Sequence, residues 1–140
     1  LAPASSRLLG EEVWMAHVAW GAAKARDVGR SRLVWLLSDD LMDRSRIEPL
    51  VVGSGAEFVA WTGRSARPVL AAGAIPDLVL VDLALQWALD SIEELSSAGV
   101  RVIAFGPHID REGLRQARQA GADEVLARSA FFVKLGDLLG

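Results

Sequence analysis

Three aspartates stand where their carboxylates can act together. Asp39 and Asp40 follow a short apolar run that ends at Leu37. Asp82 is the last residue of another such stretch, residues 77–82. Clustered carboxylates repel one another, so they bind a cation, share a proton or stay solvated. A hard divalent ion such as Mg²⁺ suits a site made only of oxygen ligands. Aspartate is also common at such a position as a helix cap, so a purely structural role stays open beside the metal site.

Two further side chains are predicted near these carboxylates. His108 follows Gly106 and Pro107 at the end of another apolar run, where an imidazole can act as an acid, a base or a ligand. A loop histidine next to a helix start is the plainer interpretation of the same residue. Trp87 belongs to the apolar segment that follows Asp82, and we expect its side chain across the crevice that the strand ends form.

Short apolar runs alternate with helical patterns from residue 32 to residue 140. The runs cover residues 33–37, 56–61, 78–81, 100–105 and 124–127. This alternation predicts a mostly parallel, doubly wound sheet with helices on both faces. In the strand order 2-1-3-4-5 the first and third strands are neighbours. The three aspartates then meet at the rim of the sheet where such folds hold their ligands.

The first and last helices are predicted from different signals. Pro49 would lie inside the first helix if that helix began at Leu41. Ser45 and Glu48 form a capping-box pattern, which favours a start near Ser45, and a kink at Pro49 is the alternative. For the last helix, the helical spacing of apolar residues predicts a buried side. That side comprises Phe131, Leu135, Leu138 and Leu139.

Composition limits the classes of protein to consider. The 140 residues are 51% hydrophobic, which suits one domain with a substantial core. The absence of cysteine excludes disulfides and thiolate metal sites. The net charge of −3 disfavours general nucleic-acid binding, and the absence of GxGxxG and Walker A patterns disfavours dinucleotide and NTP binding. No apolar run is long enough to span a membrane and no signal peptide is predicted, so we expect a cytoplasmic location.

Residues 1–31 form a segment distinct from the alternating pattern. Residues 10–28 are predicted to be helical, and Trp14 and Trp20 contribute to a broad apolar side. Two tryptophans on so short a segment are not expected to face water. The sequence therefore predicts an N-terminal extension that docks on the domain of residues 32–140 or pairs with a second copy in a homodimer.

The stretches carrying the carboxylates are similar to a known family. Residues 36–40 (Leu-Leu-Ser-Asp-Asp), 76–83 (Pro-Asp-Leu-Val-Leu-Val-Asp-Leu) and 121–126 (Gly-Ala-Asp-Glu-Val-Leu) resemble receiver domains of bacterial two-component response regulators. The resemblance spans residues 32–140 and implies a flavodoxin-like (CheY-like) three-layer sandwich. It also implies that Asp39 and Asp40 hold Mg²⁺ and that Asp82 is the phosphoacceptor equivalent.

Several residues depart from the receiver pattern. The family has Thr or Ser where this chain has Gly106, so a hydroxyl that contacts the phosphoryl group is missing. The family's essential Lys is replaced by Arg128, a wide planar fork rather than a point charge. Val125 and Leu126 stand where the family often has an aromatic residue that moves with the switch. These departures indicate a degenerate receiver, or pseudo-receiver.

Three functional hypotheses follow from these observations. The first is a non-enzymatic signalling or scaffold module that binds a protein partner, is not phosphorylated and needs no cofactor. The second is an atypical receiver that accepts a phosphoryl group on Asp82, with Mg²⁺ and with Arg128 in place of lysine. The third is a small enzyme or ligand-binding protein whose crevice uses Asp40, Asp82 and His108.

Overall fold

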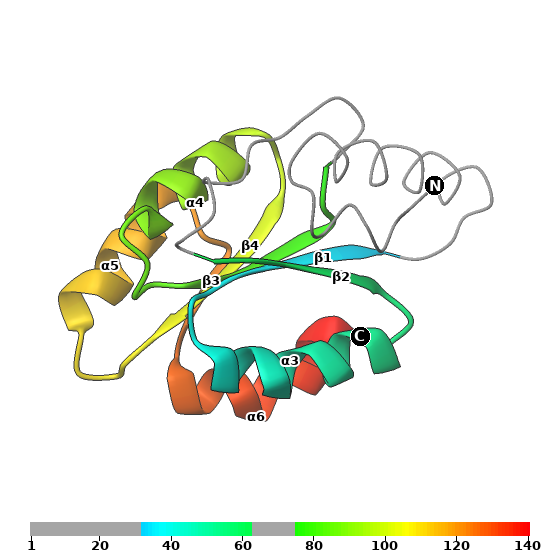
Figure 1. The fold of residues 1–140 in the computed structure, drawn as a ribbon. Coiled ribbons are helices and arrows are strands. Elements are labelled where there is room, and N and C mark those ends of the chain that lie inside the picture. Colours follow the sequence, from blue (N-terminus) through cyan, green and yellow to red (C-terminus); the bar gives the residue numbers. More distant parts are fainter. Residues whose placement is uncertain (1–31, 63–74) are drawn as a thin grey trace.

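A five-stranded parallel sheet lies between two layers of helices in the computed structural model, which describes residues 32–62 and 75–140 (Figure 1). The strands are β1 (Leu33–Leu37), β2 (Glu57–Trp61), β3 (Leu78–Asp82), β4 (Arg101–Gly106) and β5 (Glu124–Ala127). The described helices are α3 (Leu41–Gly53), α4 (Ala88–Ser97), α5 (Arg111–Ala120) and α6 (Arg128–Leu139). The strand order is β2-β1-β3-β4-β5, so the predicted flavodoxin-like sandwich is confirmed. The predicted extension, residues 1–31, lies outside the described residues.

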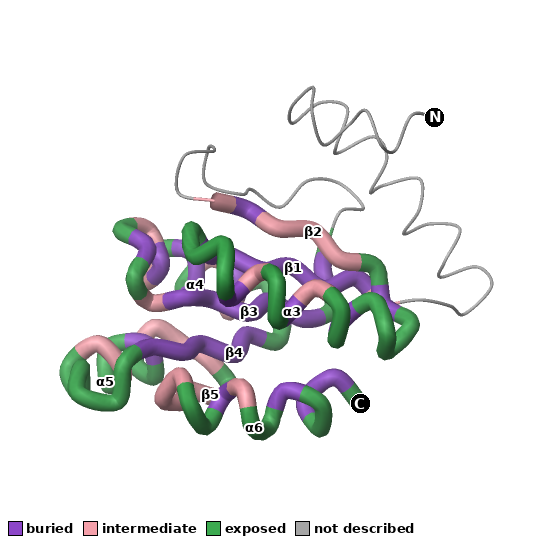
Figure 2. The backbone as a smooth tube through the Cα atoms, turned by 60° about the horizontal axis from the view of Figure 1, so that its bottom comes forward, coloured by how far each residue is buried: buried purple, intermediate pink, exposed green. Residues whose placement is uncertain are grey.

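The sheet separates two apolar clusters because successive side chains of a strand point to opposite faces. In β1, Trp35 and Leu37 join the cluster beneath α4 and α5, whereas Val34 and Leu36 join the cluster beneath α3 and α6. The three inner strands are almost wholly buried, and the edge strands β2 and β5 are mostly half-buried (Figure 2). The uninterrupted apolar runs of the sequence therefore correspond to strands that are covered on both faces.

Helix α3 begins at Leu41, so the predicted start near Ser45 is wrong. Asp40 is the N-cap, and its Oδ1 accepts hydrogen bonds from the backbone N–H groups of Met42 at 2.9 Å and Asp43 at 3.1 Å. The Ser45 hydroxyl instead donates to the Leu41 carbonyl within the helix. Pro49 lies inside the helix, where it lacks the N–H that would reach the Ser45 carbonyl. That carbonyl belongs to an exposed residue, so water can satisfy it.

The inward side of α6 packs as the helical spacing predicts. Phe131, Leu135, Leu138 and Leu139 are all buried. The Phe131 ring stacks on Phe105 of β4, with ring centroids 4.2 Å apart and planes 10° from parallel. This contact fixes the first turn of α6 against the carboxyl end of the sheet, which is where the acidic residues lie.

We expect Phe131→Ala to lower the free energy of unfolding by about 3 kcal/mol, because it removes a fully buried ring and leaves a cavity. Urea denaturation followed by circular dichroism measures the change. Val133→Ala, two residues along the same helix at an exposed position, is the matched control and should change the value by less than about 0.5 kcal/mol. Equal effects of the two variants would contradict the packing of α6 described above.

Candidate functional site

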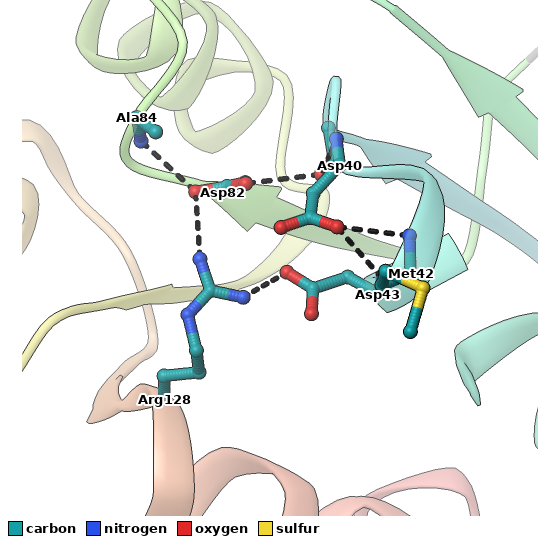
Figure 3. Close-up of polar contacts among 7 residues, drawn as sticks. Asp40, Met42, Asp43, Asp82, Ala84 and Arg128 are labelled. Carbon is teal, nitrogen blue, oxygen red and sulfur yellow. Dashed lines mark hydrogen bonds and ion pairs between the residues drawn. The ribbon is translucent and has the colours of Figure 1, made fainter. Parts of the chain in front are cut away.

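Asp82 lies at the carboxyl end of β3 and faces the layer formed by α3 and α6. The alternation along β3 decides this direction, since Leu78 and Leu80 belong to the cluster on that face. The residue is only 2% exposed. Its carboxylate lies between the start of α3 and the start of α6, so groups from both helices can reach it (Figure 3).

Both oxygens of the Asp82 carboxylate accept hydrogen bonds. Oδ1 accepts from the backbone N–H of Ala84 at 2.9 Å, and Oδ2 accepts from the hydroxyl of Ser38 at 3.0 Å. The Ser38 oxygen in turn accepts from the backbone N–H of Asp40 at 3.0 Å. Sequence reasoning missed Ser38, although its position directly before the acidic pair, and so at the same strand end, was a usable signal.

Arg128, the first residue of α6, spans the gap between two buried carboxylates. Its Nη1 donates to Oδ2 of Asp43 in α3, and its Nη2 lies 3.7 Å from Oδ1 of Asp82 (Figure 3). Asp43 is buried, whereas a third of the Arg128 side chain stays exposed. The guanidinium therefore reaches inward from a partly open position to compensate two desolvated charges. Asp43 was missed as a site residue, although its spacing of four from Ile47 places both on the buried side of α3.

The surroundings of Asp82 raise the pKa of its carboxyl above the usual value. Burial is the largest influence and raises the pKa of this carboxyl, because desolvation penalises the charged state. The hydrogen bonds from Ala84 and Ser38 oppose that effect. Repulsion by the carboxylates of Asp40 and Asp39 raises the pKa further. The carboxylates of Asp39 and Asp40 are thus close enough to influence the pKa of Asp82.

The three aspartates are not arranged as a set of metal ligands. Within residues 32–62 and 75–140, no group of three or more His, Cys, Asp or Glu side chains is placed to hold a metal ion. Asp39 and Asp40 are exposed, and Asp40 uses Oδ1 to cap α3. The structural role that the sequence left open for this residue is the one that the structure shows. The Mg²⁺ site remains a prediction from the family resemblance.

Three predicted site residues remain to be placed: Gly106, His108 and Trp87. Gly106 ends β4 and pairs in register with Ala127, the residue before Arg128. A Cβ placed at Gly106 would approach the side chain of Leu83 to 3.4 Å. His108 is exposed in the turn between β4 and α5. Trp87 is half-buried at the start of α4 and packs against the cluster on the opposite face from the Asp82 carboxylate.

Comparisons with known proteins place the fold. No family model matches the sequence, and no curated protein matches it significantly. Among solved structures, a receiver domain protein from Clostridium thermocellum is 18% identical with a TM-score of 0.65, covering 77% of this chain and 90% of its own. A receiver protein from Pseudoalteromonas atlantica is 15% identical with a TM-score of 0.61, covering 75% and 91%. A CheY-like receiver from Methanospirillum hungatei is 17% identical with a TM-score of 0.59, covering 78% and 94%. The chain therefore has a receiver-like fold.

In the described part of the chain, no helix is both long enough and apolar enough to cross a bilayer.

Asp82→Asn is expected to stabilise the protein at pH 7 by about 1 kcal/mol, since it removes a desolvated charge while Arg128 keeps Asp43 as a partner. The folded state holds the Asp82 proton more tightly than the unfolded state. Wild-type stability therefore falls as pH rises from about 4 through the raised pKa. The advantage of the variant should grow over that window and then level off.

Urea denaturation between pH 4 and pH 8 measures this stability difference. Asp137→Asn, at an exposed position, is the control, with an expected change under about 0.5 kcal/mol. A gain independent of pH would contradict the raised pKa.

Arg128→Met is expected to lower the free energy of unfolding by about 1–2 kcal/mol, because Asp43 would keep its burial and lose its cation. The value is below that of a fully buried pair, since a third of the Arg128 side chain is exposed. Adding Asp43→Asn should recover part of the loss, as the uncompensated charge disappears. Denaturation of the two single variants and the double variant gives the coupling energy. Additive effects would show that Arg128 does not depend on Asp43.

Proposed function

We propose that this chain is a signalling or scaffold module of the two-component type, which acts by binding a protein and is neither phosphorylated nor an enzyme. The observation that carries the proposal is the Arg128 guanidinium, which bridges Asp43 and Asp82. The receiver-like fold supports the signalling context. The departures at the strand ends support the absence of phosphorylation.

Both oxygens of the acceptor-equivalent carboxylate already accept hydrogen bonds. Asp82 accepts from Ala84 and Ser38, and Arg128 lies 3.7 Å from it on the side of α6. A phosphoryl group entering on Oδ1 or Oδ2 would compete with one of these contacts. The guanidinium is also committed to Asp43 as a planar fork, whereas a lysine ammonium on its flexible stem can turn toward a new charge. This arrangement favours one lasting state of the pocket.

The strand next to Asp82 lacks the group that would respond to a phosphoryl group. Gly106 has no hydroxyl, and Leu83 lies against the position that a side chain at Gly106 would take. Val125 in β5 is half-buried and packs on the apolar cluster beneath α4 and α5, where the family often has a mobile aromatic residue. With neither a hydroxyl nor an aromatic residue to move, the fold is suited to presenting a constant binding surface.

One observation favours an atypical phosphoryl-accepting receiver as the second candidate. Asp82 is a buried carboxylate with a cation close by, and Ser38 brings a hydroxyl to it from β1 rather than from β4. If Arg128 moved from Asp43 toward a phosphoryl group, its charge would stabilise that group. The two candidates differ in whether a covalent adduct forms at Asp82, which a single experiment decides.

We expect no adduct when the full chain is incubated with Mg²⁺ and acetyl phosphate, and no change of tryptophan fluorescence with beryllofluoride. Intact-mass spectrometry detects the phosphoryl group directly. Asp82→Asn is the matched control, because it removes the acceptor and preserves the volume of the side chain. A phosphoryl adduct on the natural chain that Asp82→Asn abolishes would refute the proposal and establish the second candidate.

The double variant Gly106→Ser, Arg128→Lys tests whether these two departures account for the proposed lack of phosphorylation. A serine at position 106 requires only a small adjustment of Leu83. We expect the double variant to acquire an adduct that depends on Asp82, while each single variant stays unreactive. Denaturation curves of all variants confirm that each is folded before the assay is interpreted.

A further inference from the structure

The junction between α3 and α6 forms a hollow on the surface next to the Asp82 pocket. Its volume is about 410 Å³, and it is lined by Arg46, Arg128, Ser129, Phe132 and Val133. This size accommodates a few side chains of another molecule rather than a whole domain face. Arg128 belongs to the lining of this hollow and also pairs with Asp82, so the two features share one side chain.

Arg46 contributes a positive charge that no acidic residue of the described chain neutralises. Its guanidinium lies 3.7 Å from the centre of the Phe132 ring, and in the described ranges no carboxylate forms an ion pair with it. Its neighbour Arg44 is different, because it pairs with Glu48 along α3. Stacking on an aromatic face holds the guanidinium in place and leaves its edge free to donate hydrogen bonds.

The charges around the hollow favour a ligand with a single negative charge. Arg128 is shared between two carboxylates, Asp43 and Asp82, so it offers little positive charge to a bound ligand. Arg46 is then the one lining cation without a counter-charge among the described residues. A carboxylate matches that single charge. A doubly charged phosphate would be only half compensated and would be repelled by Asp43 and Asp82.

Apart from the two arginines and Ser129, the lining of the hollow is apolar, and exposed apolar surface continues beyond it. Val133 is 83% exposed, and Leu50, one turn along α3 from Arg46, is 45% exposed. Gly136 follows Phe132 by one turn of α6, and a Cβ at that position would meet nothing within 4 Å. Glycine inside a helix weakens the helix, and no packing within the described chain accounts for it here. It leaves room for a second backbone to approach α6 closely.

We propose that the α3–α6 groove binds a segment of a partner protein that presents apolar side chains around one carboxylate. The groove is the hollow lined by Arg46, Arg128, Ser129, Phe132 and Val133, together with Leu50 and Gly136 one turn further along the two helices. The inference rests on the proposed function and deepens it by naming the chemistry of the partner. A free carboxylate ion would leave the apolar surface uncovered, so a protein segment fits the groove better than a small anion.

The test selects phage-displayed amphipathic peptides on the full chain and measures their affinities by isothermal titration calorimetry. The selected peptides should share one Glu or Asp flanked by apolar residues. Arg46→Gln should weaken the best peptide about tenfold, the loss of one charge-assisted contact. Changing the peptide Glu to Gln should weaken binding by the same factor, and the two changes together should cost no more than one alone. With Arg46→Glu, a peptide carrying Lys in place of that Glu should recover affinity.

Two control variants separate docking from folding. Arg118→Gln removes an exposed arginine from α5, which lies on the other face of the sheet, and should leave peptide affinity unchanged. Gly136→Leu fills the open space on α6 and should abolish peptide binding. The same variant should raise the midpoint of thermal unfolding, because leucine is a better helix former than glycine. Loss of binding with a raised midpoint cannot come from misfolding.

Several outcomes would overturn the inference. They are the absence of any enriched acidic peptide, and affinities that Arg46→Gln does not change. Self-association that Arg46→Gln abolishes would assign the groove to a second copy, and Arg46-dependent binding of a peptide of residues 10–28 would assign it to the N-terminal extension. These failures are distinct from failure of the proposed function. A phosphoryl adduct on Asp82 would refute that function and leave the peptide affinities standing.

Discussion

The contacts at the carboxyl end of the sheet are organised around the buried carboxylate of Asp82. A buried charge is costly unless hydrogen bonds and an opposite charge compensate it. Ala84 and Ser38 supply the hydrogen bonds, and Arg128 supplies the charge from the first turn of α6. Because the same guanidinium also holds Asp43, this compensation ties β3, α3 and α6 together at one point.

Packing and electrostatics support each other at that point. The stacking of Phe131 on Phe105 fixes the first turn of α6, and this places Arg128 within reach of both carboxylates. Asp40 fixes the first turn of α3 as its N-cap and thereby positions Asp43. A receiver-like framework is thus held in one arrangement by contacts between its own residues. The inner side of the α3–α6 junction is satisfied by these contacts, while its outer side, around Arg46, offers a charge and an apolar surface to another molecule.

Local patterns predicted the framework well and misplaced one helix start. The apolar runs identified the strands, since a strand covered on both faces needs apolar residues on both. The spacing around Phe131 identified the buried side of α6 for a similar reason. The start of α3 was predicted wrongly because Ser45 carries a capping signal that Asp40 also carries. Burial of Asp43 and Ile47 against the sheet decides between the two, and a capping pattern contains no information about burial.

The sequence by itself determined the layered α/β architecture, because hydrophobic periodicity and chain connectivity govern that feature. The strand order, and with it the meeting of Asp40 and Asp82 at one rim, was predicted through the resemblance to receiver domains. The sequence also determined that Gly106 and Arg128 stand at the neighbouring strand ends. Only the tertiary structure decided which acids Arg128 pairs with, since Asp43 is 85 residues away along the chain. These pairings depend on the register of β5 beside β4 and on how α6 packs against α3. A side chain's neighbours across elements follow from distances in the folded state, which residue types and spacing do not specify.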